Sequence, residues 1–507
     1  METVFWGALL RFTQAFIQAT PTILVGVMVA GVFRRLMGYE STRRLFGNNT
    51  WRALPQAWAV GMLLPVCSLG VIPVMREMRR AGVSGGAILA FGLTAPLFNP
   101  ISVLYGLTLS DPVVILTFSF CSLVIVTVMG IGWDKLFPNT SEANSDPPEV
   151  AFGIKRMLSI GVYCAREIIG ANSLYIFTAL IGVAVLSALL PLGYLQSAAE
   201  HTDPWAPLFM TGIAIPIYAT PMTAMVQLAA MFQHGNSVGA AFALLALGAG
   251  ANIGILVWMV REFGLKKTTA WFALLVSVVL LLSYTVDKPL YPHGVEPIGH
   301  THAFDIYCAP FHASIQNAFP LAIKILRDKT APHELVSLFA LGVLIVSGVV
   351  LHFCDRQGKI EAWVERQPEV QPNMDIVIPG PVLGGISLVG LIGLSVLGCY
   401  VYYPPPSEIL EEMRIVNTEV ASATIAKDWD TAQYWIPIYD NWSRKLQVSM
   451  YLRGQNITPF HRAKARVLRD KLESLKHGIE NKDIEDSRQL GLDVTNAFIR
   501  MRTAYTR

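Results

Sequence analysis

The amino-acid sequence predicts an all-α integral membrane protein with two inverted repeats, re-entrant or broken helices, two extra C-terminal spans and a C-terminal extramembrane helical bundle. Three observations predict this fold: a pattern that occurs twice, long apolar stretches, and an abrupt change to charged sequence near residue 402. Hydrophobic residues make up 53% of the chain and charged residues only 15%. Ordinary soluble domains contain about 25% charged residues, so much of this chain is expected to face lipid.

The repeated pattern places proline, glycine and small polar residues within apolar sequence. Its first copy runs from Leu64-Pro65-Val66-Cys67 through Gly82-x-Ser84-x-Gly86-Ala87 to Asn99. Its second copy runs from Ile215-Pro216-Ile217-Tyr218 through Gly235-x-Ser237-x-Gly239-Ala240 to Asn252. Repeats with such interruptions are typical of transporters whose helices break near mid-membrane. Non-helical backbone survives at that depth only where it is buried in protein or lines a cavity.

Eight apolar stretches are long enough to cross a bilayer, which needs about 20 residues per helix. The predicted spans are residues 9–33, 84–108, 112–133, 171–195, 238–260, 268–286, 333–353 and 379–401. Two further stretches, 55–75 and 206–232, contain the first half of each repeat. Arginines flank the first of these on both sides, whereas acidic residues precede the second, with no adjacent Lys or Arg. The positive-inside rule then predicts re-entrant hairpins from opposite sides, which inverts the second repeat.

The alternative topology replaces both hairpins by full spans and makes the repeats parallel, which places residues 76–80 outside. In the preferred topology the tail after residue 403 lies outside the cell. The predicted domains are a membrane core at 1–286 (repeat 1 at about 1–137, repeat 2 at about 157–286), a loop at 287–332, two additional transmembrane helices at 333–401 and a soluble helical bundle at 402–507. Four helices are expected in that bundle, at about 407–426, 428–450, 459–478 and 482–504.

Composition and motifs also narrow the class of function. A net charge of +3, dispersed along the chain, does not suggest a nucleic-acid partner. The sequence has no His-x-x-x-His pair, nucleophile motif or glycine-rich phosphate loop, so we expect no catalytic residues and no enzyme. The expected partners are the lipid bilayer, a small solute, and a protein or second copy bound outside the membrane through the C-terminal bundle.

Polar side chains near the helix breaks form the predicted substrate pathway. They are Cys67, Ser68, Thr94, Asn99 and Ser102 of the first repeat and Tyr218, Thr220, Thr223, Gln227 and Asn252 of the second. Gln14 and Gln18 on the first span are expected to join them. No Asp, Glu, Lys or Arg lies deep in a predicted span, so the pathway suits a neutral or weakly coordinated solute. Alternatively, each residue bonds neighbouring helices or allows close packing.

The first break resembles the signature of a known family. Residues 64–73, Leu-Pro-Val-Cys-Ser-Leu-Gly-Val-Ile-Pro, are similar to Pro-Leu-Cys-Ser-Cys-Gly-Val-Ile-Pro of the predicted-permease family that includes the methylarsenite efflux permeases. The resemblance extends over about the first 290 residues and implies a multi-pass inner-membrane permease, with arsenicals one known substrate class. Leu69 replaces the second family cysteine, which removes a paired-thiolate site. A metal, a metalloid or a sulfur-containing species are the expected solutes.

The loop at 287–332 gathers side chains that bind metals. His300, His302, Cys308 and His312 are candidate ligands for zinc or copper, and Asp287 lies at the start of the same loop. The alternative is a solvated loop with scattered histidines, and no other cofactor is expected. A membrane scaffold or sensor that uses this loop and the bundle is the alternative function.

Overall fold

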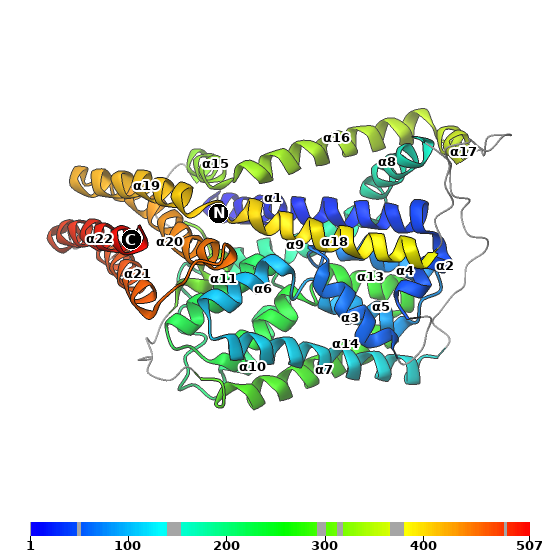
Figure 1. Cartoon of the computed structure of the whole chain (residues 1–507), viewed down its shortest axis with the longest axis horizontal. Coiled ribbons are helices and arrows are strands. Elements are labelled where there is room, and N and C mark those ends of the chain that lie inside the picture. The colour runs from blue at the N-terminus through cyan, green and yellow to red at the C-terminus, as the bar shows by residue number, and fades with distance from the viewer. Residues whose placement is uncertain are drawn as a thin grey trace. The chain divides into compact units, whose positions relative to one another are not determined.

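A computed structural model describes residues 2–47, 52–138, 154–291, 301–311, 318–365, 380–480 and 484–506. All regular secondary structure in these ranges is helical (Figure 1). The chain divides into two compact units: unit 1 is 1–103 with 112–395, and unit 2 is 104–111 with 396–507. Unit 1 contains most of both repeats, and unit 2 contains the C-terminal helices.

Within the described ranges, six helices are long and apolar enough to cross a membrane, and a bent pair supplies a seventh. The six are Glu2–Leu45, Pro112–Leu136, Ala171–Leu189, Leu265–Asp287, Pro332–Cys354 and Leu388–Ala426. The last of these stretches joins most of α18 (Gly380–Tyr402) to α19 (Pro406–Ala426). The prediction of an all-α, multi-pass membrane protein is therefore confirmed.

The first repeat consists of short helices around two breaks. After α1 (Glu2–Val32) and α2 (Gly38–Leu45), α3 (Ala53–Leu63) and α4 (Val71–Arg80) are separated by residues 64–70. Then α5 (Gly85–Thr94) and α6 (Pro100–Leu109) are separated by residues 95–99, and α7 (Pro112–Leu136) follows. Helices α3 to α6 have 10 or 11 residues each. A single helix needs about 20 residues to cross a bilayer, so none of the four crosses alone.

The second repeat has the same order of helices and breaks. After α9 (Ala171–Leu189), α10 (Ala206–Ala214) and α11 (Pro221–Gln233) are separated by residues 215–220. Next, α12 (Val238–Ala243) continues into a π-helical turn (Leu244–Ala249), and α13 (Ile253–Phe263) follows after a bend of 52°. The long α14 (Leu265–Asp287) completes the repeat. The breaks thus occur where the sequence pattern predicts them.

Unit 1 has two polar ends that lie at opposite ends of α1. Near the start of α1, Arg11 donates hydrogen bonds to the Asp305 and Cys308 carbonyl oxygens. That segment is in turn joined to the 190–205 loop by backbone bonds from Thr301 and Ala309. Beyond the other end of α1, Arg34 lies 3.6 Å from Glu77 at the charged end of α4. Arg11 and Arg34 are 23 positions apart in the sequence, so about 35 Å of helix separates these ends.

Unit 1 also contains helices outside the predicted spans. The stretch Ile154–Ile169 forms α8, which lies between the predicted spans 112–133 and 171–195. Cys164 Sγ lies 3.5 Å from the Val27 carbonyl oxygen of α1, and Gly348 of α16 (Pro332–Cys354) packs against the backbone of Ala165. Cys164 is therefore buried among helices. The remaining helices of unit 1 are a 3-10 turn (His302–Tyr307), α15 (Ala318–Lys329) and α17 (Lys359–Glu365).

Unit 2 contains a bundle of four helices that coincide closely with the expected ranges. They are α19, α20 (Trp429–Leu452), α21 (Pro459–Glu480) and α22 (Ile484–Tyr505). Met413, Tyr439, Leu468 and Phe498 are among the buried side chains of its core.

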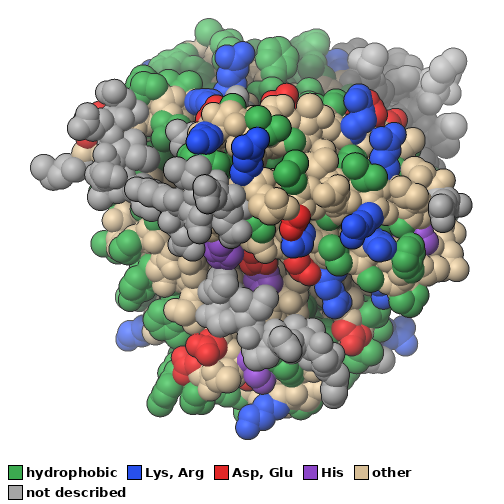
Figure 2. Space-filling model, turned by 90° about the vertical axis from the view of Figure 1, so that its left-hand side faces the viewer, with side chains coloured by type: hydrophobic (Ala, Val, Ile, Leu, Met, Phe, Trp, Pro, Cys, Tyr) green, Lys and Arg blue, Asp and Glu red, His purple; other side chains and the backbone are tan. Residues whose placement is uncertain are grey.

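The face of the molecule that Figure 2 displays carries basic and acidic side chains interspersed with apolar ones, with no single sign of charge covering it.

Candidate functional site

In each repeat, a serine caps the helix that precedes the second break. Ser84 Oγ accepts a hydrogen bond at 3.3 Å from the backbone N–H three residues on and so caps α5, and Ser237 Oγ caps α12 in the same way at 3.1 Å. Each serine follows a tight turn at a glycine with positive φ: Gly82 at 75° and Gly235 at 65°. Only glycine adopts such a φ without strain, which explains why both copies carry it there.

An aspartate from the last span of each repeat reinforces these caps. Asp134 Oδ1 accepts a hydrogen bond from Gly86 N, and Asp287 Oδ1 accepts one from Gly239 N, both at 2.8 Å. Ser237 Oγ also donates to Asp287 Oδ1 at 2.7 Å. Asp287, which the sequence grouped with the metal-type side chains of the following loop, is therefore a helix-capping residue.

Two breaks from different repeats meet in the centre of unit 1. Asn252 Nδ2, at the second break of repeat 2, donates to Ser68 Oγ, at the first break of repeat 1, at 2.6 Å. Beside this contact, the Tyr218 hydroxyl lies next to the thiol of Cys67, its equivalent in repeat 1, without a hydrogen bond of normal geometry. Cys67 Sγ accepts a hydrogen bond from Gly70 N at 3.4 Å. The structure thus brings four predicted pathway residues together.

Three other predicted pathway residues bond within repeat 1. Asn99 Oδ1 accepts a hydrogen bond from Ser102 N at 2.8 Å at the start of α6, and Thr94 Oγ1 donates to a carbonyl of its own helix, also at 2.8 Å. Asn252 caps α13 in the same way, with Ile255 N donating to its Oδ1 at 3.0 Å. Asn99 and Asn252 are therefore equivalent capping residues that end the second break of each repeat.

A cavity of about 180 Å³ lies beside the first break of repeat 2. Gln14 and Gln18 of α1 line it, together with Tyr218, Thr220 and Thr223 from the break and the first turn of α11. Thr220 caps that helix by accepting a hydrogen bond from Thr223 N at 3.1 Å. Five residues that the sequence assigned to one pathway thus share one cavity.

Gln227, another predicted pathway residue, does not line the cavity. Its Oε1 accepts a hydrogen bond from the Tyr307 hydroxyl at 3.1 Å, and its Nε2 donates to the Ala303 carbonyl oxygen at 3.0 Å. The side chain therefore fastens the 3-10 turn at 302–307 onto α11. The sequence carries no local signal for this contact, because the bonded residues are 76 and 80 positions apart.

Charged side chains line the cavity too, contrary to the expectation of a neutral pathway. They are Arg11, Lys329 and Glu334. Arg11 falls inside the predicted span at 9–33, and it donates to the Asp305 carbonyl oxygen at 2.7 Å and the Cys308 carbonyl oxygen at 3.2 Å. Backbone acceptors from a distant loop thus make an arginine tolerable in this span, which sequence analysis of the span alone does not reveal.

The predicted metal ligands are only partly described. His300 and His312 lie outside the described residues. His302 Nδ1 lies 2.7 Å from Asp305 Oδ2 and 3.0 Å from Gln196 Nε2. Cys308 is buried, and burial raises the pKa of its thiol, which disfavours the thiolate that binds metals. Metal binding by this loop stays a prediction.

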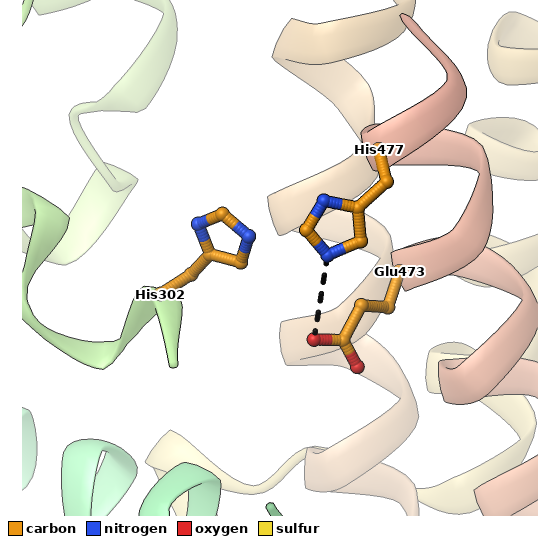
Figure 3. Close-up of side chains that lie close together, drawn as sticks. All are labelled: His302, Glu473 and His477. Atoms are coloured by element: carbon orange, nitrogen blue, oxygen red, sulfur yellow. Dashed lines mark ion pairs between the residues drawn. The ribbon is translucent and has the colours of Figure 1, made fainter. Parts of the chain in front are cut away.

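Outside that loop, a histidine of unit 2 has a carboxylate neighbour. His477 and Glu473, one turn apart on α21, point toward one another, with Nε2 and Oε1 4.0 Å apart (Figure 3). Figure 3 also draws His302, whose described partners belong to unit 1. Within either unit, the described residues bring no three metal-binding side chains together.

The capped breaks and the cavity lie in a part of the chain that matches a known family. The family model described as "Predicted permease" matches residues 5–287. The chain belongs to this permease family. The permease is 27% identical to the UPF0718 protein YcgR of Bacillus subtilis over 292 residues, which cover 54% of this chain and 93% of YcgR. No solved structure matches it.

A second relative of the permease comes from Streptococcus mutans. It is 26% identical over 90 residues, which cover 18% of this chain and 30% of the relative. Its name describes a subunit of a two-component membrane permease complex. The resemblance drawn from the motif around Cys67 is thus confirmed at the level of the family. The matched region ends with α14, so it contains both repeats and leaves out the C-terminal bundle.

At the end of unit 1 away from the cavity, the permease has a buried carboxylate in a basic setting. Glu77 is 1% exposed, and it pairs with Arg80 and lies 3.6 Å from Arg34. The Tyr163 hydroxyl donates to its Oε1 at 2.8 Å. These contacts join α4 to α8 and to the π-helical turn (Phe33–Met37) that follows α1. Removing one partner would leave a buried charge uncompensated, which is strongly destabilising.

Two further ion pairs hold the same end of α4. Arg76 pairs with Glu167 of α8, and Arg79 Nη1 lies 2.8 Å from Glu262 Oε2 near the end of α13. One short helix is thus tied to both repeats by its charged end. The sequence identified these arginines as topology signals but gave no indication of their partners.

Proposed function

We propose that this permease moves a small solute across the cell membrane, through a path that starts at the cavity and continues between the helix breaks. The observation that carries the proposal is a continuous set of buried polar contacts. Tyr218 lines the cavity and lies beside Cys67, and the next residue, Ser68, bonds to Asn252. Breaks inside a membrane protein are tolerated where they are buried or line a cavity, which fits this role.

The charged end of α4 is the other end of the proposed path. Its ion pairs with α8 and α13 hold that end closed, while the cavity lies toward the opposite end of α1. Alternating access in repeat-built transporters closes one end while the other is accessible. Arginine and lysine are concentrated at the α4 end, so we place it in the cytoplasm and the cavity outside. This assignment makes the two repeats inverted.

The class of solute follows from the thiol content of the first break. Cys67 has Leu69 where the related motif carries a second cysteine, so a solute held by two thiolates at this loop does not fit. Family membership favours a transporter over an enzyme. A small metal, metalloid or sulfur-containing species that needs at most one thiol remains the proposed substrate.

Transport assays on reconstituted protein test the proposal. Purified permease in proteoliposomes should move one or more labelled candidate solutes, and a small thiol reagent should stop transport by reacting with Cys67. A protein that keeps only Cys67 of its six cysteines should remain sensitive, and the matched protein with Cys67→Ala should transport but be insensitive. Equal inhibition of both proteins would show that the path does not pass Cys67. Absence of transport for every solute class would contradict the permease assignment.

A further inference from the structure

The cavity lining carries more positive than negative charge. Arg11 and Lys329 contribute two cationic groups and Glu334 one carboxylate. Glu334 Oε2 accepts a hydrogen bond from Ala331 N at 2.8 Å, which caps α16, so part of its accepting capacity is committed to that helix. The described lining residues therefore sum to one net positive charge.

Arg11 is held in the cavity wall by neutral acceptors. Its Nε donates to the Cys308 carbonyl oxygen, one Nη to the Asp305 carbonyl oxygen and the other Nη to Gln14 Oε1 at 3.2 Å. A guanidinium has five N–H donors, so these three bonds fix it and leave two donors. The Asp305 carboxylate interacts with Arg11 electrostatically but also accepts from Gln196 at 3.3 Å.

The start of α11 adds a second source of positive potential. This helix has 13 residues, and its N-cap residue Thr220 and Thr223 of its first turn line the cavity. The amino end of a helix carries a partial positive charge that favours anions. The two hydroxyl oxygens lie 2.8 Å apart, so one donates to the other and the second hydroxyl hydrogen is available to a ligand.

Tyr218 supplies an independent sign that a ligand is accepted here. Its side chain lines the cavity, is only 4% exposed, and ends in a buried hydroxyl that lies next to the Cys67 thiol but makes no hydrogen bond of normal geometry. A thiol is a weak hydrogen-bonding group. Buried hydroxyls in proteins nearly always have a partner. An acceptor atom of a bound molecule in the cavity would satisfy this one.

We infer that the cavity binds a small inorganic oxyanion, with Arg11 and Tyr218 as its principal donors. The inference rests on the proposed function and deepens it, because it makes the transported solute an anion that enters at this cavity. A volume of about 180 Å³ equals roughly six water molecules at about 30 Å³ each. That is enough for a tetrahedral or pyramidal oxyanion with part of its hydration shell.

Equilibrium binding of radiolabelled sulfate to the purified full chain in a neutral detergent tests the site. The wild-type protein should bind sulfate saturably at one site. Tyr218→Phe should weaken binding roughly 10-fold or more, because a hydrogen bond to a charged acceptor is lost. Without sulfate it should unfold at the same or a higher temperature, because the lost hydroxyl makes no hydrogen bond of normal geometry. The matched control is Tyr175→Phe, another buried tyrosine whose hydroxyl makes no hydrogen bond of normal geometry; it lies outside the cavity lining, so this variant should bind like the wild type.

Several outcomes would overturn the inference. They are equal sulfate affinity in Tyr218→Phe and wild type, no saturable binding, or a site occupied by phosphatidylglycerol headgroups in vesicles but not by free sulfate. A different result separates the two proposals. If sulfate binds at the cavity but no anion crosses proteoliposomes, the site stands and the cavity is not the mouth of the path. If a neutral solute crosses the membrane and sulfate neither binds nor inhibits, the proposed transport function is supported and the proposed anion site is rejected.

Discussion

Asn252 joins the two repeats, because its side-chain amide donates to Ser68 Oγ at 2.6 Å while its carbonyl oxygen caps α13. One side chain therefore caps a helix and also forms a contact between two breaks. The second break of repeat 2 cannot separate from the first break of repeat 1 unless this bond is lost. Ser68 and Asn252 are buried, so water does not replace the bond readily.

Replacing Asn252 should thus impair transport more than replacing Ser68. Asn252→Leu removes both the cap and the contact, and we expect transport to fall at least about tenfold while the protein still inserts in the membrane. Ser68→Ala removes only the contact and leaves a buried amide donor unsatisfied, at a cost of about 1–3 kcal/mol. Transport rates in proteoliposomes, normalised to the protein that elutes as a single species, measure both effects. Parental rates in both variants would place the path elsewhere.

Asn99→Leu is the matched variant in repeat 1. It removes the equivalent cap, in which Asn99 Oδ1 accepts from Ser102 N. A loss of transport similar to that of Asn252→Leu would indicate that the two breaks act as a pair. Normal transport would show that repeat 2 alone forms the site.

The breaks and their caps were predictable because they depend on residues that are close together in the sequence. Proline, glycine and serine fix the turn at Gly82 and the cap at Ser84, and the same residue types recur at 235 and 237. The helices of unit 2 were predictable for the same reason, since Asp428 caps α20 within its own segment.

Other features depend on partners that are remote in sequence. Arg11 is stabilised by carbonyl groups 294 and 297 residues away. The amphipathic α8 alternates apolar residues with Arg166 and Glu167, whose ion-pair partners lie on α17, at Asp355 and on α4. No span of apolar residues marks such a helix, so hydropathy alone missed it. Pairing of this kind is visible only once distant segments are placed together.

The proposed topology makes a prediction about accessibility. The exposed Lys135 at the end of α7 should face the cytoplasm, and the exposed Thr202 should face outside. Single cysteines introduced as Lys135→Cys and Thr202→Cys, in a protein with its six native cysteines replaced by serine, should react with an impermeant thiol reagent from the inside and the outside, respectively. Parallel repeats add one span before residue 135, so they would place Lys135→Cys outside and Thr202→Cys inside. Labelling from these reversed sides would therefore favour parallel repeats.

Two glycines of equivalent position should tolerate no side chain. A Cβ on Gly86 would lie 2.5 Å from the Gly130 carbonyl oxygen, and one on Gly239 would lie 2.4 Å from the Ser283 carbonyl oxygen. Since backbone must shift to relieve such contacts, Gly86→Ala and Gly239→Ala should each destabilise the protein by about 1–3 kcal/mol. The control is Gly212→Ala, because a Cβ there meets nothing within 4 Å. Thermal unfolding in detergent measures these effects. Equal unfolding temperatures for all three variants would contradict the packing argument.

Two arginines of unit 2 should respond to substitution in opposite directions. Arg444 Nε donates to Asp440 Oδ2 at 2.8 Å, whereas Arg469 has buried Nε and Nη1 atoms without hydrogen-bond partners. Burial, with the nearby positive charge of Arg444, lowers the pKa of Arg469 to about 10. Replacing a poorly compensated buried charge by an apolar side chain is often neutral or stabilising, whereas removing one partner of a buried pair is destabilising.

Arg469→Met should therefore unfold at the same or a higher temperature than the wild type. Arg444→Met should be destabilised by about 1–3 kcal/mol, and so unfold at a lower temperature, because Asp440 loses its partner. The folded-state pKa of Arg469 is depressed, so its charge penalises the fold fully below pH 10 and less at higher pH. Any gain in Arg469→Met should then be constant between pH 7 and 9 and shrink above pH 10. Thermal unfolding followed by the tryptophans of α20 measures this. A destabilised Arg469→Met at pH 7 would show that its guanidinium is satisfied in the folded bundle.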